Sequence, residues 1–163
     1  MNYHNILHND MLNGDGFRTV LFVSGCSLHC KNCQNPQTWN KKSGILFDES
    51  AKEEIFTSLE SDLISGITLT GGHPLEPYNL PTLTTLCKEI KEKYKNKTIW
   101  IYTGFTYEDI KDLEIIRYTD VLIDGAFINE LKDTSLKWRG SKNQRVIDVP
   151  KSIQSNSVIL YWD

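Results

Sequence analysis

Short apolar runs alternate along the chain with stretches whose apolar positions recur every three or four residues. The first pattern predicts strands buried on both faces of a sheet, and the second predicts helices with one buried face. Strands are expected at residues 19–24, 66–70, 98–103 and 120–124. Helices are expected at residues 50–59, 81–94 and 106–113. This alternation predicts an α/β domain with a largely parallel sheet.

Helix-start signals support these boundaries. Ser50 and Glu53 have the spacing of a capping box, and Pro81 suits the first turn of the second helix. Beyond Ile128 the periodicity weakens. Residues 145–149 and 157–162 are the further short strands that the pattern allows.

Each predicted strand ends near a glycine. These glycines are Gly25, Gly71, Gly104 and Gly125. Ligands of parallel α/β folds gather at the carboxyl ends of the strands, and glycine lets the backbone approach them closely. We therefore expect the functional site at this edge of the sheet.

Composition and charge exclude several classes of protein. A chain of 163 residues that is 39% hydrophobic and 24% charged has the composition of one globular domain, not of a disordered one. Its net charge of −3 argues against a general nucleic-acid binder. Because the sequence has neither a signal peptide nor a long apolar run, we expect a cytoplasmic protein that binds no membrane. Thiols stay reduced in the cytosol, where clustered cysteines more often bind metal than form disulfides.

Three of the four cysteines form the motif Cys-x3-Cys-x2-Cys directly after the first predicted strand. They are Cys26, Cys30 and Cys33, whereas Cys87 follows 54 residues later on the apolar face of a predicted helix. Cys87 is therefore interpreted as a core thiol. Three thiolates on a short loop suit three corners of a 4Fe–4S cluster, and the fourth iron would stay open to a substrate.

Other roles for these cysteines stay open at this point. A zinc site could be completed by a histidine, with His29, His4 and His8 as candidates. Free thiols without a function are a second possibility, although three in eight residues would invite oxidation. A simple iron–sulfur electron carrier would ordinarily use four cysteines.

The cysteine motif after the first strand, with Gly71 and Gly72 after the second, resembles the radical S-adenosylmethionine enzymes. The resemblance implies that Cys26, Cys30 and Cys33 bind a 4Fe–4S cluster. It also implies that S-adenosylmethionine chelates the open iron through its amino and carboxylate groups. One electron would then cleave the sulfonium to methionine and a 5′-deoxyadenosyl radical.

Further segments are similar to the activating proteins of anaerobic ribonucleotide reductases. They are residues 13–18, 21–26, 35, 38–39, 69–72, 99–104, 121–125 and, most specifically, 138–145. The match runs from the first residues to about Ile147. It implies one radical S-adenosylmethionine domain over residues 1–163, folded as an incomplete β/α barrel. Its core would span about residues 16–128, and residues 129–163 would form a C-terminal extension.

The resemblance also implies an activity and partners. The chain would generate a glycyl radical on the large subunit of anaerobic ribonucleoside-triphosphate reductase, using electrons from a flavodoxin-like donor. An activase of another glycyl-radical enzyme, such as pyruvate formate-lyase, is the nearest alternative, and the block at residues 138–145 argues against it. A non-catalytic zinc or iron–sulfur binding module is the alternative from a different class.

Cofactor-binding residues follow from the same resemblance. Asn32 and Gln34, on either side of Cys33, are expected to pass close to S-adenosylmethionine, unless they are ordinary polar loop residues. The backbone of Gly71 and Gly72 is expected to hold the methionine amino group.

The chain departs from the family pattern at two positions, His73 and Asp15. His73 stands where the family has Glu or Asp, so backbone carbonyls and the open iron would carry most of the amine binding. Asp15 stands where the family usually has proline.

The roles of other residues are less closely defined. Asp124 could contact the ligand or cap a following turn, and Arg139 is assigned to partner docking or local structure. Three tryptophans are expected to serve packing, namely Trp39, Trp100 and Trp138.

Overall fold

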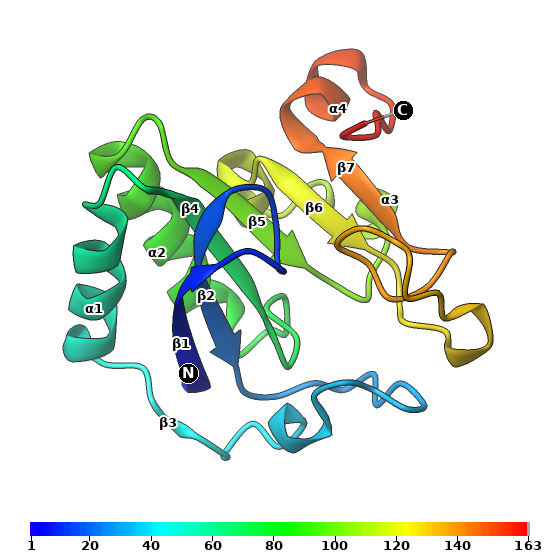
Figure 1. The fold of residues 1–163 in the computed structure, drawn as a ribbon, viewed down its shortest axis with the longest axis horizontal. Coiled ribbons are helices and arrows are strands. Elements are labelled where there is room, and N and C mark those ends of the chain that lie inside the picture. Colours follow the sequence, from blue (N-terminus) through cyan, green and yellow to red (C-terminus); the bar gives the residue numbers. More distant parts are fainter. Residues whose placement is uncertain (163) are drawn as a thin grey trace.

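A computed structural model describes residues 1–162 and shows an α/β fold built on one seven-stranded sheet (Figure 1). The sheet order is β3-β1-β2-β4-β5-β6-β7. The strands are β1 Asn2–Asp10, β2 Phe17–Val23, β3 Ile45–Leu46, β4 Ile64–Gly71, β5 Thr98–Tyr102, β6 Val121–Asp124 and β7 Arg145–Asp148. The central strands β2, β4, β5 and β6 are parallel, and β3, β1 and β7 pair antiparallel at the two edges. The predicted α/β class with a largely parallel sheet is confirmed.

The helices are α1 Glu49–Leu59, α2 Leu80–Lys93, α3 Tyr107–Ile110 and α4 Val149–Ser155. Pro81 lies in the first turn of α2, as predicted. The predicted cap of α1 at Ser50 is wrong, because the carboxylate of Asp48 accepts the N–H of Ala51 at 3.0 Å and starts the helix one residue earlier. The helix expected at 106–113 is also shorter, since α3 ends at Ile110.

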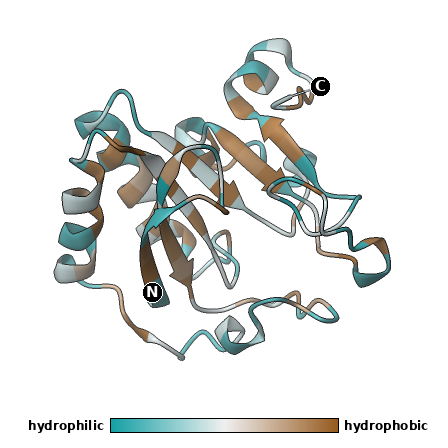
Figure 2. Ribbon diagram, viewed as in Figure 1, coloured by the Kyte–Doolittle hydropathy of each residue, from teal (hydrophilic) through white to brown (hydrophobic). Residues whose placement is uncertain are grey.

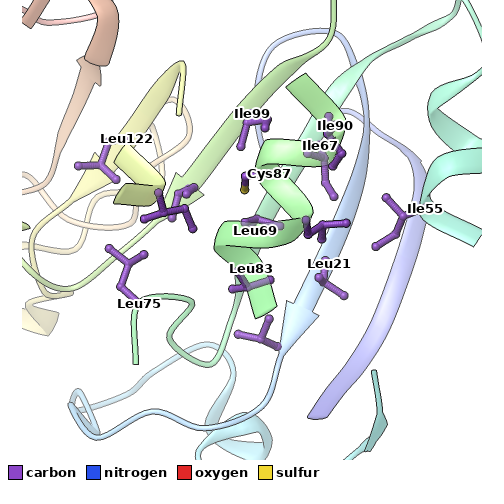
Figure 3. Close-up of a cluster of buried hydrophobic side chains, with 14 of the residues drawn as sticks. Leu21, Ile55, Ile67, Leu69, Leu75, Leu83, Cys87, Ile90, Ile99 and Leu122 are labelled. Atoms are coloured by element: carbon purple, nitrogen blue, oxygen red, sulfur yellow. The ribbon is translucent and has the colours of Figure 1, made fainter. Parts of the chain in front are cut away.

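Helices α1 and α2 cover one face of the sheet and form the larger core with it. Apolar residues from β2, β4 and β5 point into this layer, where the strands and the inner helix faces are the most hydrophobic parts of the ribbon (Figure 2). Cys87 of α2 lies among them, against the sheet (Figure 3). Burial raises the pKa of its thiol to about 12. The prediction of a core thiol is therefore confirmed.

The opposite face of the sheet carries a second, aromatic cluster. Trp100 packs edge-on against Trp138 with ring centroids 4.7 Å apart, so the packing role predicted for these two rings is confirmed. The guanidinium of Arg18 lies 5.1 Å from the Trp100 ring and donates to the carbonyl oxygens of Ile67 and Thr98 at 2.7 and 2.9 Å. These contacts hold the Arg18 side chain against Trp100 and the backbone of β4 and β5 on this face of the sheet.

Strand β1 was not expected from the sequence, because only Tyr3 and Ile6 among its nine residues are buried. The strand expected at residues 145–149 is confirmed as β7, whereas residues 157–162 make only a single bridge, between Leu160 and Ile147. None of the helices within residues 1–162 has the length and apolarity needed to cross a membrane.

Candidate metal centre and ligand cavity

The carboxyl ends of the parallel strands open into a cavity of about 490 Å³. The loop after β2 contributes all three clustered cysteines to its wall, and the turn after β4 contributes Gly71 and Gly72. Residues from the turn after β5 and from the segment 127–144 complete the wall. The volume lies in the usual range for small-molecule sites. The cavity thus lies at the edge of the sheet where the functional site is expected.

The cysteine loop is fixed at its start and irregular beyond it. The N–H groups of Gly25 and Cys26 donate to the carbonyl oxygens of Thr38 and Trp39 at 2.6 and 3.1 Å, which fastens the loop to the segment that follows it. His29 and Asn32 have positive φ, at 46° and 56°. Residues with positive φ do not continue a right-handed helix, so the loop is irregular at these two positions.

The three thiols are free and partly buried, and burial raises the pKa of Cys26. Within residues 1–162, no three side chains of His, Cys, Asp or Glu converge on a point that could hold one metal ion. Three cysteine thiols in one cavity wall match in number the three protein ligands of a 4Fe–4S cluster with one open iron, whereas a structural zinc site normally takes four protein ligands.

The histidines considered as a fourth ligand have other partners. His4 is hydrogen-bonded to the hydroxyl of Ser43 at 2.8 Å, and His8 lies 2.8 Å from the carboxylate of Glu54. The ring of His29 stacks on Trp39 with centroids 4.5 Å apart. These contacts give no support to a zinc site completed by histidine.

The turn after β4 lies directly against the start of the cysteine loop. Its N–H groups at Gly72 and His73 donate to the carbonyl oxygens of Val23 and Gly25 at 2.8 and 2.7 Å. A Cβ at Gly72 would meet the Gly25 oxygen at 2.5 Å, which is too close for any side chain. The glycine is therefore required by this contact between two backbones.

The ring of His73 is buried beneath this turn, with 2% of the residue exposed. Its Nδ1 lies 3.3 Å from a carboxylate oxygen of Glu76, and its Nε2 lies 2.7 Å from the hydroxyl of Thr103. Because a carboxylate only accepts, Nδ1 carries the proton and Nε2 accepts from Thr103. Burial lowers the pKa of His73, so the ring is neutral near pH 7. Both ring nitrogens thus bond to the protein.

Glu76 is a buried residue of the site that sequence reasoning missed. Its Oε1 accepts the N–H and the hydroxyl of Ser27 at 2.7 and 2.6 Å, next to the first cysteine. Burial favours the neutral acid, but hydrogen bonds from Ser27 and His73 outweigh burial and lower the pKa of Glu76. An ionised carboxylate therefore ties the turn after β4 to the cysteine loop. The sequence signal that could have identified Glu76 was its position in a loop, three residues after His73.

Replacing Glu76 by alanine is expected to lower the free energy of unfolding by about 2–3 kcal/mol, because the N–H and hydroxyl of Ser27 lose their buried acceptor. Ser27→Ala removes only the hydroxyl bond and should cost about 1 kcal/mol. The exposed Glu130→Ala is the control and should change stability by less than about 0.5 kcal/mol. Urea denaturation of the three variants measures the difference. Equal losses for Glu76→Ala and Glu130→Ala would contradict the bridging role.

Other predicted residues separate into two groups. Gln34, Gly71, Gly72 and His73 line the cavity. The side chain of Asn32 instead donates to the amide oxygen of Asn129 at 3.0 Å and is not among the lining residues.

Asp124 is not among the residues that line the cavity. It accepts the N–H of Tyr107 at 2.8 Å and pairs through both oxygens with Arg145, at 3.0 and 2.5 Å. The structure therefore supports neither role considered for Asp124: its backbone partner, Tyr107, lies at the start of α3 and precedes it in the chain, so Asp124 caps no following turn, and it does not line the cavity.

The segment 138–144 lines the cavity through Trp138, Arg139, Gly140 and Gln144. Sequence reasoning used this block to identify a family and assigned its arginine to docking or local structure. The specificity of this block was the signal that could have placed it in the cavity wall.

Comparisons with known proteins agree with this geometry. The sequence model of a family described as "4Fe-4S single cluster domain" matches residues 12–147. A protein of Enterobacteria phage T4 is 44% identical over 146 residues, which cover 90% of this chain and 93% of that protein. Proteins of Haemophilus influenzae and Escherichia coli K12 are 42% and 40% identical over 148 and 150 residues, covering 88% and 90% of this chain and 96% and 97% of theirs.

All three relatives are named anaerobic ribonucleoside-triphosphate reductase-activating protein. The chain belongs to the family of anaerobic ribonucleoside-triphosphate reductase-activating proteins and contains a 4Fe–4S single cluster domain.

Proposed function

We propose that this protein activates anaerobic ribonucleoside-triphosphate reductase by reductive cleavage of S-adenosylmethionine. One observation carries the proposal: three cysteines without a fourth share a cavity with a glycine turn that presents backbone groups. A bound 4Fe–4S cluster would supply one electron to the sulfonium, giving methionine and a 5′-deoxyadenosyl radical. That radical would take a hydrogen atom from a backbone glycine of the reductase's large subunit, leaving 5′-deoxyadenosine and a glycyl radical.

The chain's own residues hold and shield the reactants. Cys26, Cys30 and Cys33 would bind the cluster through their thiolates. Gly71 and Gly72 would present backbone groups to the amino group of S-adenosylmethionine, and Gln34 would lie beside it. His73 supports this turn from below and brings no charge to the amine, since both of its ring nitrogens are bonded within the protein.

We further propose that the sheet is an incomplete β/α barrel of the radical S-adenosylmethionine type, in a single domain over residues 1–163. Its open edge would be covered by the reductase, which would bring the glycine to the cavity. A flavodoxin-like protein would supply the electron.

The proposal is tested by incubating anaerobically reduced, cluster-loaded protein with S-adenosylmethionine. Formation of 5′-deoxyadenosine, and of a glycyl radical signal in electron paramagnetic resonance when the reductase is added, is expected. Colourless protein that binds one zinc, or brown protein that forms no 5′-deoxyadenosine, would contradict it. A radical on pyruvate formate-lyase, but not on the reductase, would reassign the partner.

His73→Asp, which restores the acidic residue of the family pattern, is expected to change S-adenosylmethionine affinity less than about tenfold. The new carboxylate would stand beside Glu76 in a buried site, where two negative charges repel each other. The double variant His73→Asp/Glu76→Gln keeps a single carboxylate and separates this repulsion from binding. Equilibrium dialysis measures the affinities. A gain of several orders of magnitude in either variant would show that the natural site is impaired.

A further inference from the structure

The cavity wall contains one formally charged side chain apart from its cysteines, the guanidinium of Arg139. Its Nε is buried and has no hydrogen-bond partner, and the residue makes no hydrogen bond or ion pair with any described residue. A guanidinium has five N–H donors, and leaving a buried donor unpaired is costly. The wall therefore offers donors and a positive charge to an acceptor that comes from outside the chain.

The backbone on both sides of Arg139 is anchored. Trp138 has a positive φ of 59°, which is uncommon for so large a residue, and its carbonyl accepts the hydroxyl of Tyr102 at 2.7 Å. On the other side, the N–H of Gly140 donates to the side-chain oxygen of Gln144 at 2.9 Å. Backbone strain of this kind persists where the surrounding structure enforces it, and it occurs preferentially at ligand sites.

The same turn lies next to the end of the cysteine loop. The amide nitrogen of Gln34, one residue after Cys33, is 3.6 Å from the point that a Cβ on Gly140 would occupy. A ligand bound beside Cys33 would therefore also lie close to the turn that contains Arg139. Within the cavity, this cation and the cysteine loop face the same space.

We propose that Arg139 binds the α-carboxylate of S-adenosylmethionine and so selects the amino-acid end of this ligand. The inference rests on the proposed function. S-adenosylmethionine carries one anionic group, its carboxylate, and two cationic ones. Among the described residues of the wall, no carboxylate competes for the guanidinium. A planar guanidinium pairs with a carboxylate through two parallel hydrogen bonds, which a lysine cannot reproduce.

The test compares two ligands that differ only in the carboxylate, S-adenosylmethionine and its decarboxylated analogue. Their dissociation constants are measured by anaerobic equilibrium dialysis with cluster-loaded wild-type protein, Arg139→Gln and Arg139→Lys. We expect Arg139→Gln to weaken S-adenosylmethionine binding about 10–100-fold, the range for a charge-assisted hydrogen-bonded pair. The analogue should bind both proteins within about twofold, because it has no carboxylate to lose. Arg139→Lys should fall between wild type and Arg139→Gln.

The outcomes are distinct. An equal loss for both ligands would overturn the proposal, because it would show a change in cavity shape. Unchanged S-adenosylmethionine binding with weaker binding of the reductase would also overturn it, in favour of an acidic segment of the partner. Wild-type protein that binds no S-adenosylmethionine would instead refute the proposed function. Iron content and thermal unfolding of the variants should match wild type, since Arg139 bonds to no described residue.

Discussion

Replacing Cys26, Cys30 or Cys33 by serine is expected to abolish the iron–sulfur cluster. Each thiolate would hold a different iron of the proposed cubane, and a serine hydroxyl is not ionised near neutral pH and binds iron poorly. Iron should fall from ~4 atoms per chain to near zero, together with the brown colour and the formation of 5′-deoxyadenosine. Iron and sulfide analysis of anaerobically reconstituted protein measures the loss.

Cys87→Ala is the matched control, because it removes the one cysteine that lies outside the cavity. Its thiol is fully buried in the core, and the high pKa keeps it protonated. The variant should lose about 1–2 kcal/mol of stability through the small cavity it creates and should keep its full iron content. If Cys87→Ala lost the cluster, or if one of the three serine variants kept it, the assignment of ligands would be wrong.

The sequence was informative where one physical cause dominates. Continuous apolar runs placed β2, β4, β5 and β6, because strands buried on both faces need such runs. The cysteine loop and the Gly71–Gly72 turn were expected together, since the carboxyl ends of parallel strands share one edge. Strand β1 was missed because it faces solvent over much of its length, and its polar residues imitate a loop.

The remaining parts of the site depend on tertiary contacts that no local pattern encodes. In the sequence, Glu76 resembles an ordinary acidic loop residue. Only the folded structure shows that its carboxylate accepts the N–H of Ser27. In the sequence, Arg139 resembles an ordinary surface arginine. In the structure it follows Trp138, which has a positive φ, and it lines the cavity. Both residues lie in a recognised sequence motif or close to one. Where their side chains lie, and what they contact, depends on the folded structure and could not be predicted from the motif.

Asp124→Asn is expected to lower the free energy of unfolding by about 3 kcal/mol. The carboxylate is 1% exposed, it accepts the N–H of Tyr107, and it pairs with Arg145 through both oxygens. Asparagine keeps the shape but removes the charge and turns an N–H group toward the guanidinium. This decrease in stability is near the lower end of the range of about 3–5 kcal/mol for breaking a buried ion pair. The reason is that the Arg145 side chain is 34% exposed and keeps its contacts with Glu108. Urea denaturation at pH 7 measures it.

Glu108→Gln is the control for this variant, since Glu108 pairs with the same guanidinium but is 56% exposed. Its loss at pH 7 should stay below about 1 kcal/mol because solvent screens the pair. The hydrogen bonds from Arg145 lower the pKa of Glu108 from 4.5 to about 2. Because the folded-state pKa is the lower one, this contribution is complete above about pH 5 and disappears as the pH falls toward 2. Equal losses for Asp124→Asn and Glu108→Gln at pH 7 would show that burial does not set the strength of the Asp124 pair.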